Sequence, residues 1–444
     1  MSTNRIKSRR FLLFGTLVFI LSLLIPISLM HTAFSQTFVL PCTITTSGNA
    51  WNGEIAFGLW QTSPSNGPVG SYLVVMKTDG TVEYLRQSNA SSPNYEVAKN
   101  LAQNTLMFQG EPIVGGATTS ALLATHLWNY VTNTTVDYPN VIGHHDIEYN
   151  PINNTFLTLQ EYVKTVNGTQ ILFDKIVELD ASGNILWSWD TYDHIPLSEA
   201  DPFGPTASYN GSTVMDFTHS NALEWDYNSS VVYLNCRHIN TFYKINQTTS
   251  NLIWACGEYG NFTLLAGNGT QVPSLWYHSH GTYQVSPNVF VMFDNDFDNE
   301  TNPTDCQSRM IELTLNEQNM SAWVSWNWTA PKSYWSFALG NTARLPNGDH
   351  IGVFGVPSHQ RPENQPWDFN DTGAVMVEVN QTGSVVRTWT FPVGWAMYRV
   401  QPLTFPTVPL TIPENIGGSI LLGAFALLTG IAAIEFWIKK PRIK

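Results

Sequence analysis

The chain has 444 residues and carries 34 acidic against 21 basic side chains, which gives a formal net charge of −13 at pH 7. Basic residues cluster only at the two ends, which excludes the extended basic surface that nucleic-acid binding requires. Charged residues make up 12% of the chain and aromatic residues 13%, which favours a compact β protein with buried tryptophans over a flexible stalk.

The first 36 residues have the pattern of a secretory signal peptide or signal anchor. Four basic residues lie within positions 1–10, an apolar run covers 11–30, and the small-residue stretch Thr32–Ser35 follows. A charged start, an apolar middle and small residues at the end are shared by export signals. We therefore expect residues 1–36 to direct the rest of the chain out of the cytoplasm.

Residues 37–405 repeat one pattern, in which alternating apolar residues are broken by Asp-Gly or Thr-Gly turns and end on tryptophan. This pattern predicts antiparallel units of four strands. Units of about 50–70 residues that stack around an axis are typical of β-propellers. We count six units and predict an all-β, six-bladed propeller of four-stranded antiparallel blades, in which a strand near Tyr398 completes a blade begun at the other end. The clearest copies lie at 154–187, 231–254, 289–324 and 350–389, with weaker ones at 72–82 and 97–130.

Asparagine sequons and cysteines in this region bear on the compartment. About fourteen Asn-x-Ser/Thr triplets occur, and we expect several to be glycosylated. Of the four cysteines, Cys236 and Cys256 flank one strand pair and are the best candidates for a disulfide. The alternative that both remain free thiols is equally compatible with the sequence. No Cys-x-x-Cys spacing indicates a zinc site. Examples of the sequons begin at Asn89, Asn133, Asn167, Asn228, Asn268 and Asn380.

The C-terminal end has the features of a membrane anchor. A Pro-rich linker at 406–415 leads into residues 416–438, which are almost wholly apolar, and a basic tail follows at 439–444. At a rise of ~1.5 Å per residue this stretch spans the ~30 Å hydrocarbon layer, and the positive-inside rule keeps the tail in the cytoplasm. We therefore predict a propeller outside the cytoplasm, held at the cell membrane by a single C-terminal transmembrane helix.

Four polar residues at the starts of successive units predict a site where the units meet. His145 lies in Gly-His-His-Asp, His219 in Asp-x-x-His-x-Asn, Arg237 on the next strand, and His280 in His-Ser-His-Gly. A permanently charged arginine repels a cation and grips sulfate or phosphate with two parallel hydrogen bonds, so the set suits an oxyanion better than a metal. A single histidine would more simply be a buried structural residue, but three at the same position of the unit favour a site.

Short motifs give this region a specific resemblance to a known family. They are Asp216-Phe-Thr-His-Ser-Asn221, Cys236-Arg-His238, Phe293-Asp-Asn295, Ser308-Arg309 and Tyr398-Arg399. With them, residues 70–405 resemble the arylsulfotransferase family, whose members are secreted propellers that transfer sulfuryl groups without the nucleotide donor of cytosolic sulfotransferases. The resemblance implies an aryl sulfate donor, a phenolic acceptor and no cofactor or metal. It also implies a sulfated histidine at His280 and sulfate binding by His145, His219 and Arg237.

Four neighbouring residues are candidates for substrate binding, each with a structural alternative as a buried turn amide, a structural histidine or a surface ion pair. They are Asn221, Asn295, Arg309 and His278. His278 could also replace His280 as the nucleophile, because residues two apart on a strand share a face. We prefer His280, which heads the strand that follows.

The assignment of His145 has the same ambiguity. His144 precedes His145, and the preference for His145 rests on its pairing with Asp146, which could fix the tautomer of a neighbouring imidazole. Trp276 and Tyr277 could stack on an aryl ring, although a place in the core explains them equally well.

Two other functions are compatible with parts of the pattern. A non-enzymatic, membrane-anchored propeller that serves as a cell-surface binding or adhesion module explains the anchor and the sequons, but not an inward-facing His/Arg set. A metal-assisted hydrolase would use the histidines as ligands, which Arg237 and the lack of a carboxylate cluster disfavour. We also expect two departures from periplasmic members of the family, namely no N-terminal β-sandwich and a C-terminal anchor.

Overall fold

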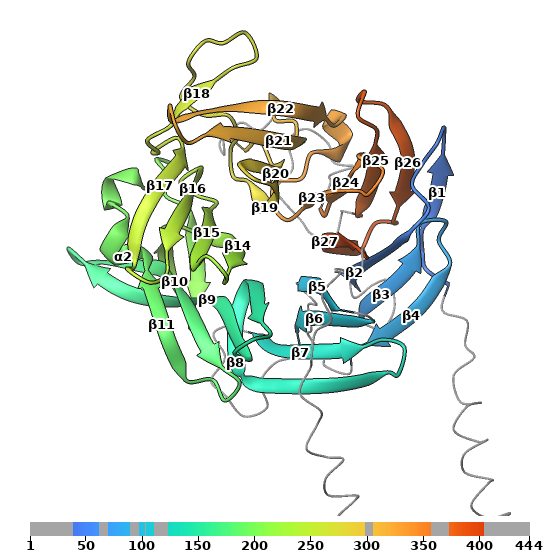
Figure 1. Cartoon of the computed structure of the whole chain (residues 1–444), viewed down its shortest axis with the longest axis horizontal. Coiled ribbons are helices and arrows are strands. Elements are labelled where there is room, and N and C mark those ends of the chain that lie inside the picture. Colours follow the sequence, from blue (N-terminus) through green and yellow to red (C-terminus); the bar gives the residue numbers. More distant parts are fainter. Residues whose placement is uncertain are drawn as a thin grey trace, which may run out of the picture. The chain divides into compact units, whose positions relative to one another are not determined.

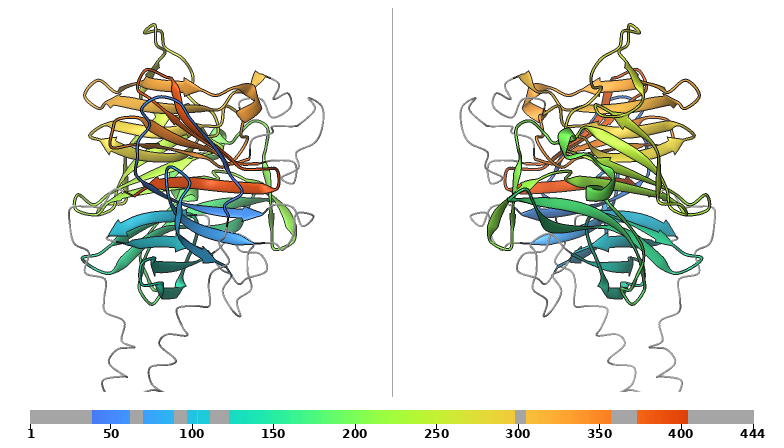
Figure 2. Two further views of the ribbon diagram at one scale, coloured as in Figure 1. Left: turned by 90° about the vertical axis from the view of Figure 1, so that its right-hand side faces the viewer. Right: turned by 90° about the vertical axis from the view of Figure 1, so that its left-hand side faces the viewer.

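The computed structural model describes residues 39–61, 70–88, 97–102, 104–110, 123–297, 305–356 and 373–403. From residue 42 on, the strands form a ring of sheets around a central axis (Figure 1). The side views in Figure 2 show the sheets stacked one against the next around the ring. Nearly all strand pairs are antiparallel, so the prediction of an all-β, propeller-like fold is confirmed.

The described strands form five hydrogen-bonded sheets. One four-stranded sheet consists of β27 (Trp395–Pro402), β2 (Glu54–Gln61), β3 (Ser71–Lys77) and β4 (Val82–Gln87). The other consists of β14 (Ser220–Asp226), β15 (Val231–Cys236), β16 (Thr241–Asn246) and β17 (Asn251–Gly257). The first five-stranded sheet consists of β1 (Thr43–Thr46), β26 (Val385–Thr390), β25 (Val375–Val379), β24 (His350–Phe354) and β23 (Asn341–Arg344). The second consists of β18 (Thr263–Leu265), β22 (Ser321–Thr329), β21 (Arg309–Asn316), β20 (Val289–Asp294) and β19 (His280–Ser286).

The fifth sheet has nine strands and differs most from the sequence prediction. Its members are β5 (Val97–Ala102), β6 (Thr105–Gln109), β7 (Leu123–Asn129), β8 (Thr134–Asn150), β9 (Thr155–Val166), β10 (Thr169–Asp180), β11 (Ile185–Asp190), β12 (Thr206–Tyr209) and β13 (Ser212–Asp216). Short helical turns in the connections are α2 (Thr191–His194), η2 (Leu197–Glu199) and η4 (Lys332–Tyr334).

The prediction of six separate four-stranded blades is therefore wrong. The cause is the 17-residue strand β8, whose first part pairs with β7 and whose last part pairs with β9. One continuous strand thus joins two groups of strands into a single sheet. The repeat pattern does not reveal this, because the segment lies between two of the predicted units.

The core lies between the faces of neighbouring sheets. One cluster joins Leu157 and Phe173 of the nine-stranded sheet to Leu223 and Leu234 of the next sheet. Because most sheets are covered on both faces, inner strands lose the alternation of buried and exposed residues; all five residues of β25 are buried. Each fully buried apolar side chain of this size stabilises the fold by about 1.5–3 kcal/mol.

Both ends of the described chain close the ring. β27 pairs with β2 so that Pro402 lies opposite Ile55, which confirms that the segment around Tyr398 supplies a strand to the first unit. β1 pairs with β26 in the neighbouring sheet, with Thr43 opposite Thr390.

Several predictions concern segments that the structure does not describe. The signal segment 1–36, the linker 406–415, the apolar stretch 416–438 and the tail 439–444 all lie outside the described residues, so they stay predictions. Within the described ranges, no helix has the length and apolar character needed to span a membrane.

The disulfide expected between Cys236 and Cys256 does not form. Both side chains are buried free thiols. Cys236 ends β15 and Cys256 lies on β17, and β16 runs between these two strands. The sequence pattern suggested the pairing because the cysteines flank one hairpin, but an intervening strand separates them.

Candidate active site

The site is built from irregularities at the same point of four inner strands. In β8, β14, β19 and β27, pairing with the next strand shifts register at His145–Asp146, Asn221, Gly281–Thr282 and Tyr398–Arg399. Such β-bulges bend a strand and re-aim its side chains, and they are common beside active sites. We call these four irregularities the bulge ring. It explains why residues on separate sheets converge near the axis.

The backbone at the bulge ring adopts unusual conformations. His145 has φ +59° and His219 has φ +44°, a left-handed region that costs non-glycine residues energy. Gly281, next to His280, has φ +58°, and a Cβ there would lie 2.7 Å from the Cβ of Asn341. Only glycine fits at that position without a shift of the neighbouring strand.

Three of the predicted site histidines lie close together, and two of them contact one tyrosine. The ring centroids of His145 and His219 are 5.1 Å apart. The Tyr398 ring lies 5.9 Å from His145 and 5.9 Å from His280 and is steeply inclined to both. His280 and Arg237 are buried, whereas the His219 side chain keeps 32% of its surface exposed. The structure thus brings these three histidines together, with one of them reachable from solvent.

Arg237 belongs to the same group. Its Nη2 donates to the Phe337 carbonyl at 3.0 Å, which fixes one end of the guanidinium. Burial and then the positive charge of Arg237 hold the pKa of His280 well below its ordinary value. The backbone N–H of Arg237 donates to the His219 carbonyl at 3.3 Å, so the fourth predicted residue also converges with the histidines.

His280 is held in one tautomer by Asn295. The ring Nδ1 lies 2.7 Å from Asn295 Oδ1. The Asn295 amide nitrogen donates to the carbonyls of Ser336 at 2.7 Å and Leu339 at 3.0 Å, so the oxygen of this amide must face the imidazole. An oxygen can only accept, hence Nδ1 carries the proton and Nε2 keeps its lone pair. A neutral imidazole with a free Nε2 lone pair is a nucleophile.

His219 and His145 have different electrostatic partners. His219 Nδ1 donates to Asp216 Oδ2 at 2.6 Å, which fixes the orientation of the ring. His145 is surrounded by cations and other imidazoles. Burial, followed by His144, His219 and further positive groups, holds the pKa of His145 well below its ordinary value.

His144 and His278, the alternatives to His145 and His280, have structural partners instead. His144 Nε2 lies 3.3 Å from Asp174, a carboxylate that also accepts from the backbone of Ser220 at 2.7 Å. Both ring nitrogens of His278 are engaged, Nδ1 with the Phe297 carbonyl at 2.6 Å and Nε2 with Asp201 at 3.0 Å. His278 has no ring nitrogen left for a substrate, so its predicted binding role does not fit the geometry.

Arg309 is also a structural residue. Its guanidinium pairs with Asp294, with Nε 2.8 Å from Oδ2, and donates to the Leu275 carbonyl at 2.9 Å. It ties β21 to β20 and to the backbone at Leu275. Asn221 has a positioning role, since its amide donates to the Ser279 carbonyl at 2.9 Å and so ties β14 to the residue before His280.

Three further expectations are settled by burial and contacts. Trp276 is fully buried in the core between two sheets, which favours the core over the aryl-stacking alternative. Tyr277, partly buried, is fixed through its backbone N–H, 2.9 Å from Asp294 Oδ1. The carboxylate of Asp146 is engaged by Lys99, Arg399 and Tyr283, and these contacts do not support its expected role in setting the tautomer of a neighbouring imidazole.

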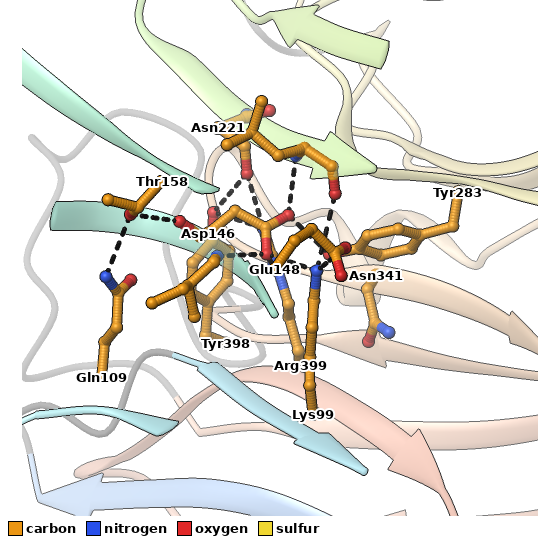
Figure 3. Close-up of polar contacts among 12 residues, drawn as sticks. Lys99, Gln109, Asp146, Glu148, Thr158, Asn221, Tyr283, Asn341, Tyr398 and Arg399 are labelled. Carbon is orange, nitrogen blue, oxygen red and sulfur yellow. Dashed lines mark hydrogen bonds and ion pairs between the residues drawn. The ribbon is translucent and has the colours of Figure 1, made fainter. Parts of the chain in front are cut away.

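Asp146 instead forms the centre of an axial network that the sequence analysis missed (Figure 3). Its carboxylate lies 2.8 Å from Lys99 Nζ and 3.1 Å from Arg399 Nη1, and it accepts from the Tyr283 hydroxyl at 3.1 Å. Burial alone would raise the pKa of Asp146, but Arg399 and Lys99 outweigh it and lower the pKa. Arg399 also lies over the Tyr398 ring, 4.5 Å from its centroid. The network therefore places buried charged side chains next to the histidine cluster.

A polar cavity of about 360 Å³ lies further along the same inner strands. Its lining includes Lys99, Glu148, Glu224, Tyr283 and Arg344. Burial raises the pKa of Glu224 to about 8. This cavity is lined by none of the predicted histidines, so the candidate active site is identified by its chemistry and not by this cavity. Lys99 and Glu224 come from isolated positions with no motif, which is why the sequence did not reveal them.

A ring of antiparallel sheets with a His/Arg centre near its axis defines a propeller-like protein equipped to hold an anion. The family model of arylsulfotransferase (ASST) matches residues 71–368, more than half of the chain. The chain belongs to this family, as the motifs predicted, and membership supports aryl sulfotransfer in general.

Other comparisons add little. None of the curated proteins matches the chain. Solved structures with a similar chain trace include a protein from Lactobacillus plantarum. It is 9% identical, the match covers 79% of this chain and 100% of that chain, and the TM-score is 0.39. A putative 6-phosphogluconolactonase from Bacteroides fragilis has 11% identity, coverage of 80% and 100%, and a TM-score of 0.34. At these values neither supports any conclusion.

Proposed function

We propose that this protein transfers a sulfuryl group from an aryl sulfate to a phenol through a covalent intermediate on His280. The observation that carries the proposal is the hydrogen bond of His280 to Asn295, which leaves Nε2 with its lone pair. The low pKa of His280 keeps this nitrogen unprotonated at neutral pH. Membership of the arylsulfotransferase family supports the reaction class.

In the first step, His280 Nε2 attacks the sulfur of the aryl sulfate. An N–S bond forms while the S–O ester bond breaks, and its electron pair leaves with the phenolate oxygen. Charge accumulates on the sulfuryl oxygens, where the fixed guanidinium of Arg237 would stabilise it. His219, whose Nδ1 donates to Asp216 Oδ2, would in its protonated form give its Nε2 proton to the departing phenolate.

In the second step, an acceptor phenol reverses this sequence. Its proton returns to His219, its oxygen attacks the sulfur, and the N–S bond breaks to restore neutral His280. Protons and charges balance over the two steps without another reactant. His145, kept neutral by its surroundings, would accept or donate one hydrogen bond to the sulfuryl group.

We also propose that the propeller lies outside the cytoplasm at the cell membrane. The basic N-terminal pattern, the apolar stretch 416–438 and the basic tail support this placement.

Purified protein mixed with an aryl sulfate and no acceptor tests the mechanism. We expect a burst of about one phenol per site, one acid-labile sulfuryl group on the peptide that contains His280, and discharge of the label by added phenol. His280→Asn should fold and show neither burst nor label. Label on His278 would move the nucleophile, and turnover without label would favour direct transfer. Absence of both turnover and label would leave the non-enzymatic surface module as the better reading.

A further inference from the structure

A second group of donor atoms adjoins the candidate active site. Among the described residues, Asp216, His219 and His238 offer ligand atoms that all lie within 4.8 Å of one another. The His219 and His238 rings are 4.7 Å apart and tilted by 32°. The Asp216 and His238 side chains are nearly buried, whereas His219 is partly exposed. An ion could therefore enter from the open side of His219.

The separations between donor atoms are close to those of a tetrahedral zinc site. With Zn–N and Zn–O bonds of about 2.0–2.1 Å, neighbouring ligand atoms lie about 3.4 Å apart. Asp216 Oδ2 lies 2.6 Å from His219 Nδ1, and His238 Nδ1 lies 3.9 Å from Asp216 Oδ1. His238 Nδ1 donates to the Asp216 carbonyl oxygen at 3.0 Å, so its proton must move to Nε2 before Nδ1 can bind an ion, and the carbonyl oxygen then offers a fourth donor. The two distances from the carboxylate lie on either side of about 3.4 Å and involve different oxygens, so side-chain movements must bring one oxygen and the ring nitrogens to that separation.

We propose that Asp216, His219 and His238 bind a Zn²⁺ ion. Two imidazoles with one carboxylate form a mixed nitrogen and oxygen donor set that zinc accepts. The ion would lie at the Nδ1 edge of His219, on the other side of the ring from Nε2. The positive charge of neighbouring Arg237 opposes a second cation nearby and limits the affinity.

Zinc binding would change the state of His219, a consequence that rests on the proposed function. Coordination needs the Nδ1 lone pair, so the proton now on Nδ1 moves to Nε2 in a neutral ring or leaves to solvent from a charged one. Asp216 would then pair with the metal instead of the imidazole. The zinc-bound ring keeps a proton on Nε2, but this neutral imidazole is a much weaker acid than an imidazolium and protonates the departing phenolate poorly, so zinc should inhibit sulfuryl transfer.

Competition for Zn²⁺ between the protein and a chromophoric zinc chelator tests binding without any activity. We expect one ion per chain in the wild type. His238→Gln and Asp216→Asn should each weaken binding at least about 100-fold. Loss of a residue that only hydrogen-bonds to a metal ligand weakens binding by up to about 100-fold, and loss of a ligand itself should cost no less. His278→Gln is the matched control, because His278 is a buried histidine paired with another carboxylate, Asp201. Unchanged binding in the control and folded circular-dichroism spectra in all variants are required.

An activity assay separates this inference from the proposed function. Added zinc should inhibit the wild type and a chelator should restore it, whereas His238→Gln should stay active and resist zinc. Absence of saturable binding, or equal binding by the wild type and the two ligand variants, overturns the zinc site whatever the activity. Binding as expected in a protein without sulfuryl transfer would retain the zinc site and reject the proposed function.

Discussion

The hydrogen bond between His280 and Asn295 decides which ring nitrogen can react. Because the Asn295 amide nitrogen donates both its protons to the carbonyls of Ser336 and Leu339, the side chain can offer only its oxygen to the imidazole. A carboxylate at the same position would behave differently, since it would also stabilise the charged ring. The choice of an amide therefore suits a histidine that must stay neutral.

This argument predicts the pH dependence of an Asn295→Asp variant. Burial and Arg237 lower the pKa of His280, so the wild type should keep kcat/KM as the pH falls below about 6.5, where an ordinary imidazole protonates. The new carboxylate should raise that pKa, so the variant should lose activity at pH 6 and recover it towards pH 8. Profiles of kcat/KM from pH 5 to 8 measure the shift. Parallel profiles would show that Asn295 does not set the charge of His280.

Arg237 should not tolerate lysine. A point charge cannot reproduce two parallel hydrogen bonds to an oxyanion, so Arg237→Lys should lower kcat/KM by roughly 100-fold or more, as loss of one preorganised oxyanion donor does. Arg309→Lys is the matched control, since Arg309 is bound to Asp294 and should affect stability more than turnover. Near-normal activity of a folded Arg237→Lys protein would contradict the assignment.

Glu224 should make stability depend on pH with a defined sign. Its folded pKa of about 8 lies above the ordinary glutamate pKa of 4.5, so the folded state keeps a proton that the unfolded chain releases as the pH rises between these values. Stability should therefore fall with rising pH in this window, at up to about 1.4 kcal/mol per pH unit. Denaturation of the wild type and Glu224→Gln at pH 5, 6, 7 and 8 measures the difference. The variant should gain relative stability as the pH rises, and a constant difference would exclude the effect.

At the scale of single strands, the bulge ring depends on glycine at one position. Gly281 has φ +58° and no room for a Cβ against Asn341. Gly281→Ala should destabilise the fold by about 1–3 kcal/mol through strain and shift His280, with loss of activity. Gly168→Ala is the control, because Gly168 has φ +84° but no atom within 4 Å of an added Cβ. Equal costs at both positions would mean that the contact with Asn341 is unimportant.

The predicted strands and the convergence of the histidines follow from patterns that sequence shows directly. Apolar alternation and turn residues predict strands, and equal positions in repeated units place His145, His219 and His280 at one end of the inner strands. The bulge ring leaves no such pattern, because an extra residue in a strand looks like any other. For the same reason the sequence could not show that Arg399 and Lys99 meet at Asp146.

Turn chemistry also offers an explanation for the frequent sequons. Asn167 and Asn210 have φ +50° and each is followed by a glycine with positive φ, in tight turns between antiparallel strands. Asn-Gly is favoured in such turns, and Thr or Ser begins the next strand. An Asn-x-Ser/Thr triplet arises at a hairpin whether or not a sugar is attached, so glycosylation stays a prediction.

For the molecule as a whole, the proposed membrane placement makes a testable prediction. Protease added to intact cells should remove the propeller, while an epitope attached after Lys444 should stay protected on the cytoplasmic side. Permeabilised cells provide the control, in which the epitope must become accessible. Loss of the epitope in sealed cells would reverse the orientation.

Ring closure by the two chain ends has a consequence for biosynthesis. Ile55 gains its partner on β27 only when Pro402 is available, and Thr43 gains its partner on β26 only when Thr390 is. At a synthesis rate of about 5–20 residues per second, the first strands wait roughly 20–70 seconds on the ribosome before the circle can shut. A nascent chain whose ring stays open for that long could still pass unfolded through an export channel, as the proposed membrane placement requires. The ring would then close on the side of the membrane that receives the last strand.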